Sequence, residues 1–167
     1  EVLWTRALAG GVVMRSLSRF TRLNPEEAFL FGLLHDVGNI VVLRIVNSQE
    51  SVIKHRIGFD TFDYLCREAH QEFGELLADA WSLPARLKAL ICDHHTPITA
   101  DDPYRAERAQ LQLTDMICSL LNYTTYESVS LLDSNAARQS GLTGQPDVLR
   151  FLVALPSRLE EALAELQ

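Results

Sequence analysis

Residues 24–38, which read Asn-Pro-Glu-Glu-Ala-Phe-Leu-Phe-Gly-Leu-Leu-His-Asp-Val-Gly, contain the strongest helix signal in the chain. Asn24 is a preferred N-cap residue, Pro25 suits the first helical position, and Glu27 stands where a capping box places its acidic residue. The residues that follow are apolar nearly all round, which is typical of a buried helix. We therefore predict that a helix begins at Pro25 and that Ala28 to Leu34 is the most buried helix of the fold.

Outside this stretch, apolar residues recur at i, i+3 and i+4, whereas the period-two alternation of strands does not persist anywhere. The pattern predicts helices over residues 2–17, 40–46, 61–81, 85–95 and 106–123. A last helix carries a leucine stripe and is expected to bend or restart at Pro156; its leucines are Leu152, Leu155, Leu159, Leu163 and Leu166. Residues 124–143 are predicted to be irregular or weakly helical. The sequence therefore predicts an all-α single domain.

Composition and charge narrow the class of protein. The 167 residues are 47% hydrophobic and 22% charged, which excludes intrinsic disorder and leaves enough apolar surface for a core. The net charge of −7 argues against a nucleic-acid or anionic-membrane binder, because such partners need a basic face. The most apolar stretch is interrupted by four polar residues that a membrane span would not carry without partners; they are His35, Asp36, Asn39 and Arg44.

The three cysteines, Cys66, Cys92 and Cys118, are widely spaced and form no Cys-x-x-Cys pair. We interpret them as small buried apolar residues in a reducing compartment. Together with the absence of a membrane span in the sequence pattern, this predicts a soluble, cytoplasmic protein.

Several polar residues lie within helices that are otherwise apolar. His35 and Asp36 lie in the most apolar helix, and a buried carboxylate there needs a partner or a cation. Four further candidates share this setting or stand at helix ends: His70, His94, His95 and Asp115. Adjacent residues project about 100° apart on a helix, so a shared site needs several helices.

Imidazole and carboxylate ligands suit Fe, Mn or Zn better than Ca. Taken singly, each of these side chains has another interpretation, as a satisfied core histidine or a helix hydrogen-bond partner. Taken together, they also fit a hydrogen-bonded polar core that stiffens the packing of the helices. His55, between Lys54 and Arg56, is interpreted as a solvated surface residue.

Arg15, Arg19 and Arg22 recur at i, i+4 and i+7 near the end of the first predicted helix. They fit a solvated face that complements the negative C-terminal end of the helix dipole. They also fit a contact with an anion or nucleotide, as a ligand sensor would need.

Residues 25–38 resemble the central motif of the HD-related output domain (HDOD), a bacterial signalling relative of the HD and HD-GYP phosphohydrolases. A second match is His70-x3-Gly74-x2-Leu77-x3-Trp81-Ser82-Leu83-Pro84, followed by Ala89-x-Ile91-x2-His94-His95. A looser third match is Leu113-Thr114-Asp115 with the later Gly141-Leu142. The resemblance implies a helical bundle of the HD-domain type over residues 1–167. These residues would be the larger C-terminal part of the family's domain, with its upstream helices absent.

The resemblance also implies roles for the candidate residues. His35 and Asp36 fall on the HD dyad, and His70 falls on a later metal-ligand histidine of HD-GYP enzymes. His94 and His95 fall on their paired histidines, and Asp115 on the closing aspartate. We therefore predict that these side chains converge in one pocket, although up to 80 residues separate them in the sequence.

Three departures from the HD enzymes concern catalysis. No histidine precedes His35, Gly38 is followed by Asn39 where HD-GYP enzymes usually have lysine, and residues 96–100 contain no Gly-Tyr-Pro motif. A hydrolytic site needs a complete metal cage with an open position for water. We therefore predict a non-catalytic regulatory or output module of bacterial signal transduction, with no catalytic residue and no cofactor expected. A metal, if present, would be Fe, Mn or Zn.

The expected partners are signalling proteins and, in one interpretation, a nucleotide ligand bound without turnover. The alternative is a metal-dependent phosphohydrolase acting on a phosphoester or nucleotide. No nucleic-acid or membrane partner is expected. The absence of upstream helices predicts an exposed apolar face on the first helix, at Trp4, Leu8 and Val12. We expect that this face either self-associates into a homo-oligomer or is covered by the missing segment in the intact protein.

Overall fold

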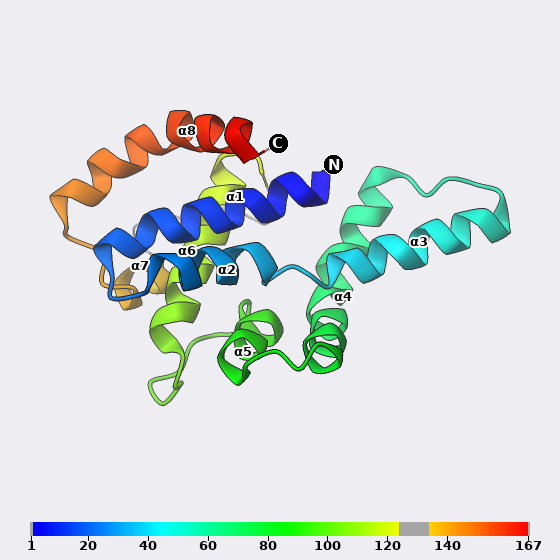
Figure 1. Cartoon of the computed structure of the whole chain (residues 1–167), viewed down its shortest axis with the longest axis horizontal. Helices are drawn as coiled ribbons and strands as arrows, with labels where there is room; N and C mark the ends of the chain where they lie inside the picture. Colours follow the sequence, from blue (N-terminus) through cyan, green and yellow to red (C-terminus); the bar gives the residue numbers. More distant parts are fainter. Residues whose placement is uncertain (1, 124–133, 167) are drawn as a thin grey trace. The chain divides into compact units, whose positions relative to one another are not determined.

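The computed structural model describes residues 2–123 and 134–166, and Figure 1 shows their helices. In chain order these are α1 (Val2–Leu17), the short 3-10 helix η1 (Ser18–Phe20), α2 (Pro25–Leu34), α3 (Asn39–Ile53), α4 (Phe59–Ala80), α5 (Ala85–Asp93), α6 (Arg105–Leu120), α7 (Asn135–Gln139) and α8 (Pro146–Leu166). The described residues contain no β-strand, so the predicted all-α class is confirmed. The chain forms two compact units, Glu1–Leu34 with His94–Gln167 and His35–Asp93.

Helix α2 begins where the sequence predicted. The Asn24 side chain accepts hydrogen bonds from the backbone N–H groups of Glu26, at 2.9 Å, and Glu27, at 3.2 Å. It therefore satisfies two of the N–H groups that the first turn leaves without a helical partner. The helix ends at Leu34, and a turn at residues 35–38 separates it from α3.

One apolar segment of the described chain, Pro25–Ile53, meets the length and hydropathy criteria for a membrane span. The turn at residues 35–38 divides this segment into helices of 10 and 15 residues. Each is shorter than the ~20 residues that a membrane-spanning helix needs. Core helices of soluble proteins commonly have the same composition, so the segment is weak evidence for a membrane.

The core of the larger unit is built around α1, which contacts α2, α6 and α8. Figure 1 shows α8 running alongside α1. The buried residues of this core include Leu8, Val13, Leu17, Leu113, Ile117, Leu155 and Leu159. Helix α8 continues through Pro156, so it does not restart there, whereas the bend expected as the alternative stays a prediction. Proline removes only one helical hydrogen bond, and the leucines on both sides of it pack into the same core.

Two expectations about burial are wrong. Helix α2 buries only Ala28, Phe31 and Gly32, and Leu30 is 49% exposed. Helix α1 buries half of its residues, including Leu8 at 3% exposure and Val12 at 4%. The predicted exposed apolar face of the first helix is therefore restricted to its beginning, at Val2 and Trp4.

The reason lies in how α1 and α2 pack. A Cβ atom added at Gly32 would lie 2.3 Å from the carbonyl oxygen of Gly10 and 2.7 Å from the Cβ of Met14. The two backbones can approach this closely because position 32 is glycine and has no Cβ atom. The close approach places the middle of α1 in the core. The apolar pattern of α2 alone does not indicate how much of α2 the neighbouring helices cover.

A buried amide links α1 to α6 within this unit. Gln110 is fully buried, and its Nε2 donates to the backbone carbonyl of Met14 at 2.8 Å. Its Oε1 accepts from the hydroxyl of Thr21 at 2.8 Å. The buried amide is therefore satisfied on both sides, as a buried polar group must be to avoid a desolvation penalty.

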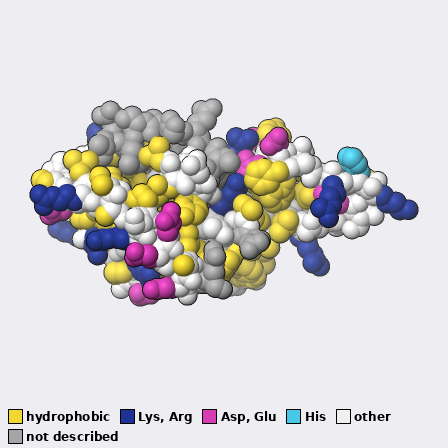
Figure 2. Space-filling model, turned by 90° about the horizontal axis from the view of Figure 1, so that it is seen from above, with side chains coloured by type: hydrophobic (Ala, Val, Ile, Leu, Met, Phe, Trp, Pro, Cys, Tyr) yellow, Lys and Arg dark blue, Asp and Glu magenta, His cyan; other side chains and the backbone are white. Residues whose placement is uncertain are grey.

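The smaller unit is a helical hairpin of α3 and α4 with α5 packed against α4. Val42, Val46 and Cys66 form the centre of its core. Cys66 and Cys118 are buried, which confirms the predicted burial of these two cysteines, whereas Cys92 is only half-buried. His55 is exposed, as predicted. On the face shown in Figure 2, charged side chains of both signs stand among hydrophobic ones.

Residues 124–133, part of the stretch predicted to be irregular, lie outside the described residues. The described remainder of that stretch contains the short helix α7, capped by the side chain of Ser134.

Candidate functional site

The first group of candidate residues lies in the smaller unit, around the carboxylate of Asp36. Its Oδ1 is 3.7 Å from Nε2 of His35 and 3.5 Å from Nε2 of His70. All three side chains are largely shielded from solvent, with exposures of 4%, 13% and 1% for His35, Asp36 and His70. One carboxylate oxygen therefore faces two imidazole nitrogens.

Local structure explains how these residues meet. The backbone N–H of Asn39 donates to the carbonyl of Asp36 at 3.0 Å, which closes the turn between α2 and α3. Gly38 places this turn directly against α4, because a Cβ atom there would lie 1.9 Å from the carbonyl oxygen of His70. A residue with a side chain at position 38 would separate Asp36 from His70.

A hydrogen bond on the side of the ring away from Asp36 sets the orientation of the His70 imidazole. Its Nδ1 lies 2.9 Å from the backbone carbonyl of Cys66, so Nδ1 carries the hydrogen and donates it to that oxygen. Nε2 then presents its lone pair toward Asp36. Histidines that bind metals are commonly held in this way, because the outer hydrogen bond fixes both tautomer and orientation.

The distances between these donors fit a shared cation. Separations of 3.5 and 3.7 Å are too long for good direct hydrogen bonds. Two ligands that each bind one transition metal at ~2.0–2.2 Å lie roughly 3–4 Å apart. The donor set therefore matches the chemistry and spacing of a site for Fe, Mn or Zn.

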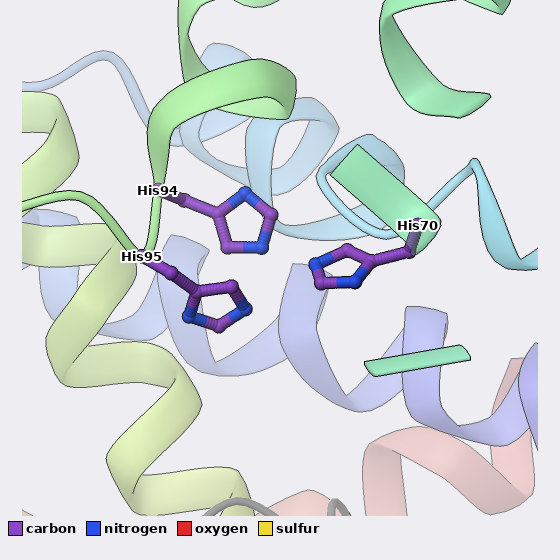
Figure 3. Close-up of side chains that lie close together, drawn as sticks. All are labelled: His70, His94 and His95. Carbon is purple, nitrogen blue, oxygen red and sulfur yellow. The ribbon is translucent and has the colours of Figure 1, made fainter. Parts of the chain in front are cut away.

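The second group lies in the larger unit. Figure 3 shows the rings of His94 and His95 next to each other, with centroids 4.1 Å apart. His94 is fully buried, whereas His95 is exposed. Asp115 is buried on α6, and a carboxylate oxygen of this residue lies within 4.8 Å of a ring nitrogen of His94. This group therefore combines imidazole and carboxylate donors, as the first does.

The segment after His95 is fixed by two side chains of α6. Nε2 of Gln112 donates to the carbonyl of His94 at 2.8 Å and to that of Thr96 at 2.9 Å. The guanidinium of Arg108 donates to the carbonyl of Thr96 at 3.0 Å and to the carboxylate of Asp102. The sequence pattern did not single out Arg108 and Gln112, although their spacing from Asp115 places all three on one face of a helix.

A cavity of about 330 Å³ adjoins this second group. It is lined by His94, His95, Pro97, Ile98, Gln112, Asp115, Met116 and Asn135. None of these lining residues is a lysine or arginine, so the cavity has no fixed positive charge of its own to attract a free anion. Its amide, imidazole and carboxylate groups suit a polar ligand that offers hydrogen-bond donors or a cation.

Three candidate arginines lie elsewhere in the larger unit, and all are exposed: Arg15 on α1, Arg19 on η1, and Arg22 after η1. The guanidinium carbon of Arg15 lies 5.1 Å from the ring centroid of Phe29, and that of Arg19 lies 5.8 Å from the ring of Phe151. These contacts are cation–π interactions, which give Arg15 and Arg19 a role in packing. Anion binding by Arg15, Arg19 and Arg22 stays a prediction.

The structure therefore brings His35, Asp36 and His70 together in one unit, and His94, His95 and Asp115 together in the other. The prediction that all six form one site stays a prediction.

The half-buried thiol of Cys92 is expected to react slowly. It lines a second cavity, of about 500 Å³, together with Glu75, Lys88 and Asp93 among others. Burial, helped by the charges of Glu75 and Asp93, raises the pKa of Cys92 to about 11. The reactive thiolate is therefore scarce below that pH and increases as pH rises toward it.

Alkylation of Cys92 by iodoacetamide at pH 8 should consequently be about 10- to 100-fold slower than that of a thiol with the ordinary pKa of 9.0, because less thiolate is present although each thiolate is a stronger nucleophile. Peptide mapping by mass spectrometry separates Cys92 from the buried Cys66 and Cys118, with N-acetylcysteine as the reference thiol. Labelling of Cys92 at the rate of the reference would refute this expectation.

The described helices and the two His–Asp groups define an all-α domain with a candidate site for a cation or polar ligand. The family model of the HDOD domain matches residues 1–97. This range includes all the candidate site residues except Asp115. The chain belongs to the HDOD family, which confirms the predicted resemblance.

A solved structure from Geobacter sulfurreducens, described as an HDOD domain protein with unknown function, is similar to this chain. The TM-score is 0.68 at 23% sequence identity, and the match covers 99% of this chain and 62% of that chain. At this identity the likeness shows the fold alone, and this chain spans less than two thirds of that relative's length. No curated protein matches the chain.

Proposed function

We propose that this chain is a non-catalytic regulatory module of bacterial signal transduction that acts by binding a protein or ligand partner. The observation that carries the proposal is Asn39. This residue is buried, and its Oδ1 accepts no hydrogen bond from the described residues. In the HD-GYP enzymes that the motif resembles, a lysine usually follows the glycine. A neutral amide in that position supplies no positive charge to stabilise a phosphoryl group in its transition state.

Metal binding without turnover is part of the proposal. His35, Asp36 and His70 would hold Fe, Mn or Zn, and the spacing of their donor atoms supports this. A bound ion would supply Lewis acidity and would tie the turn at residues 35–38 to α4. The binding of a metal would then stabilise the folded unit by mass action, which is one way for such a module to sense a signal.

Metal analysis tests this part of the proposal. Chain purified without chelator is expected to contain a transition metal, and Asp36→Asn is expected to lower its affinity by at least about 100-fold. Loss of an outer-shell partner alone commonly costs 10–100-fold, and Asp36 would be a direct ligand. His55→Asn is the matched control, because His55 is exposed in the loop that follows α3. Equal metal affinity in Asp36→Asn and the wild-type chain would contradict the proposal.

A second candidate function is a metal-dependent phosphohydrolase. The hydrogen bond from His70 to the Cys66 carbonyl favours it, since it orients Nε2 as catalytic metal sites require. The two functions differ in turnover rather than in metal binding, so an activity assay separates them.

A further inference from the structure

We propose that Arg108 and Gln112 are positioning residues that fix the His94–His95 pair for binding a cation or polar ligand. The inference rests on the proposed function, extends binding to the group of His94, His95 and Asp115, and adds two residues of α6 to that group. Neither residue is a candidate ligand. They act through the backbone of residues 94–96, which carries the two histidines.

The contacts surround His95 on both sides. Gln112 donates to the carbonyl oxygens of the two residues that flank it, His94 and Thr96, at 2.8 and 2.9 Å. Arg108 adds a second hydrogen bond to the carbonyl of Thr96, at 3.0 Å. Three hydrogen bonds from one helix thus fix the peptide groups on either side of an exposed imidazole.

Arg108 is itself held in place. Its guanidinium pairs with the carboxylate of Asp102, and both side chains are more than nine-tenths buried. The other oxygen of Asp102 accepts from the backbone N–H of Tyr104 at 2.8 Å, next to the start of α6. The fork of the guanidinium therefore spans from this anchored carboxylate to Thr96, which a lysine with its single nitrogen would not reproduce.

The same helix face carries a candidate ligand. Arg108, Gln112 and Asp115 are spaced at i, i+4 and i+7, so they lie along one side of α6. Gln112 also lines the 330 Å³ cavity beside the two histidines and Asp115. One rigid element thus positions His94, His95 and Asp115 before a ligand arrives. Preorganisation of this kind raises affinity, because less conformational entropy is lost on binding.

The test replaces Gln112 with methionine, which keeps the length of the side chain and removes its donor. In the full 167-residue chain carrying Asp36→Asn, the group around Asp36 does not compete for the ion. Titration of this chain with Co²⁺, followed by its visible absorption, is expected to show at least about 10-fold weaker binding once Gln112 is also replaced. Arg105→Met, at an exposed position of the same helix, is the matched control and should bind as the Asp36→Asn chain does. Arg108→Lys keeps the positive charge beside Asp102 and should also weaken Co²⁺ binding, because lysine cannot donate to the Thr96 carbonyl at the same time.

A readout without metal separates this inference from the proposed function. In the metal-free chain, the imidazole ¹⁵N and ¹H resonances of His94 and His95 should shift in Gln112→Met, while helix content and thermal midpoint stay close to wild type. Shifted resonances, together with no Co²⁺ binding by the chain with or without Asp36→Asn, would uphold the positioning role and refute the metal-binding part of the proposed function. Unchanged resonances, or the same Co²⁺ affinity with and without Gln112→Met in the Asp36→Asn chain, would overturn the positioning role.

Discussion

Replacement of Gly38 by alanine is expected to destabilise the chain by about 3 kcal/mol, because the new Cβ atom would overlap the backbone of α4. It would lie 1.9 Å from the carbonyl oxygen of His70 and 2.6 Å from the backbone nitrogen of Gly74. Backbone atoms cannot rotate away as a side chain can, so the turn at residues 35–38 must move off α4. Urea unfolding followed by circular dichroism measures the free energy of unfolding.

Gly58→Ala is the matched control for this change. Gly58 precedes α4 with φ −64° and ψ 155°, and a Cβ atom there would meet nothing within 4 Å. Alanine fits this conformation, and its lower entropy in the unfolded chain is offset by its weaker preference for the N-cap position of α4, so stability should change by less than about 1 kcal/mol. A Gly38→Ala variant as stable as Gly58→Ala would show that the turn does not pack on α4 as described. The displaced turn should also lower metal affinity, since it carries Asp36.

Asp102→Ala is expected to cost about 3–5 kcal/mol, because it leaves the guanidinium of Arg108 buried without its carboxylate. The side chains of Arg108 and Asp102 are 9% and 6% exposed. The backbone N–H of Tyr104 would lose its acceptor as well. Urea unfolding followed by circular dichroism measures this decrease in the free energy of unfolding.

Asp101→Ala is the neighbouring control. Asp101 is exposed, and a hydrogen bond from Thr99 lowers its pKa. Because solvent screens interactions at such a surface position, its removal should leave the free energy of unfolding nearly unchanged. Similar losses in Asp101→Ala and Asp102→Ala would mean that the effect belongs to the loop in general and not to the buried ion pair.

The fold class and most helix boundaries could be predicted because they depend on local signals. The cap at Asn24 acts within three residues of its own position, and apolar periodicity reports each helix separately. Helix α4 was predicted over residues 61–81 and runs from Phe59 to Ala80. The relative burial of α1 and α2 could not be predicted in this way, because it depends on Gly10 meeting Gly32 across the fold.

The candidate site shows the same division. His35, Asp36 and His70 could be singled out because polar residues in apolar helices need partners, and the HDOD motif names the same positions. The hydrogen bonds that support these residues could not be predicted, because their acceptors are backbone carbonyl groups. The carbonyls of Cys66, His94 and Thr96 accept the bonds that orient the histidines, and a carbonyl group is present at every residue of the sequence. Gln112 and Arg108 therefore looked like ordinary polar residues of an amphipathic helix.

Binding without turnover is tested most directly by a phosphohydrolase assay of the chain loaded with Mn or Fe. A generic phosphodiester and cyclic dinucleotides serve as substrates, and Asp36→Ala serves as the background. We predict that the wild-type chain shows no more hydrolysis than Asp36→Ala, because Asn39 supplies no positive charge beside the histidine and aspartate donors. Robust metal-dependent hydrolysis by the wild-type chain that disappears in Asp36→Ala would contradict the proposed regulatory function and establish the phosphohydrolase instead.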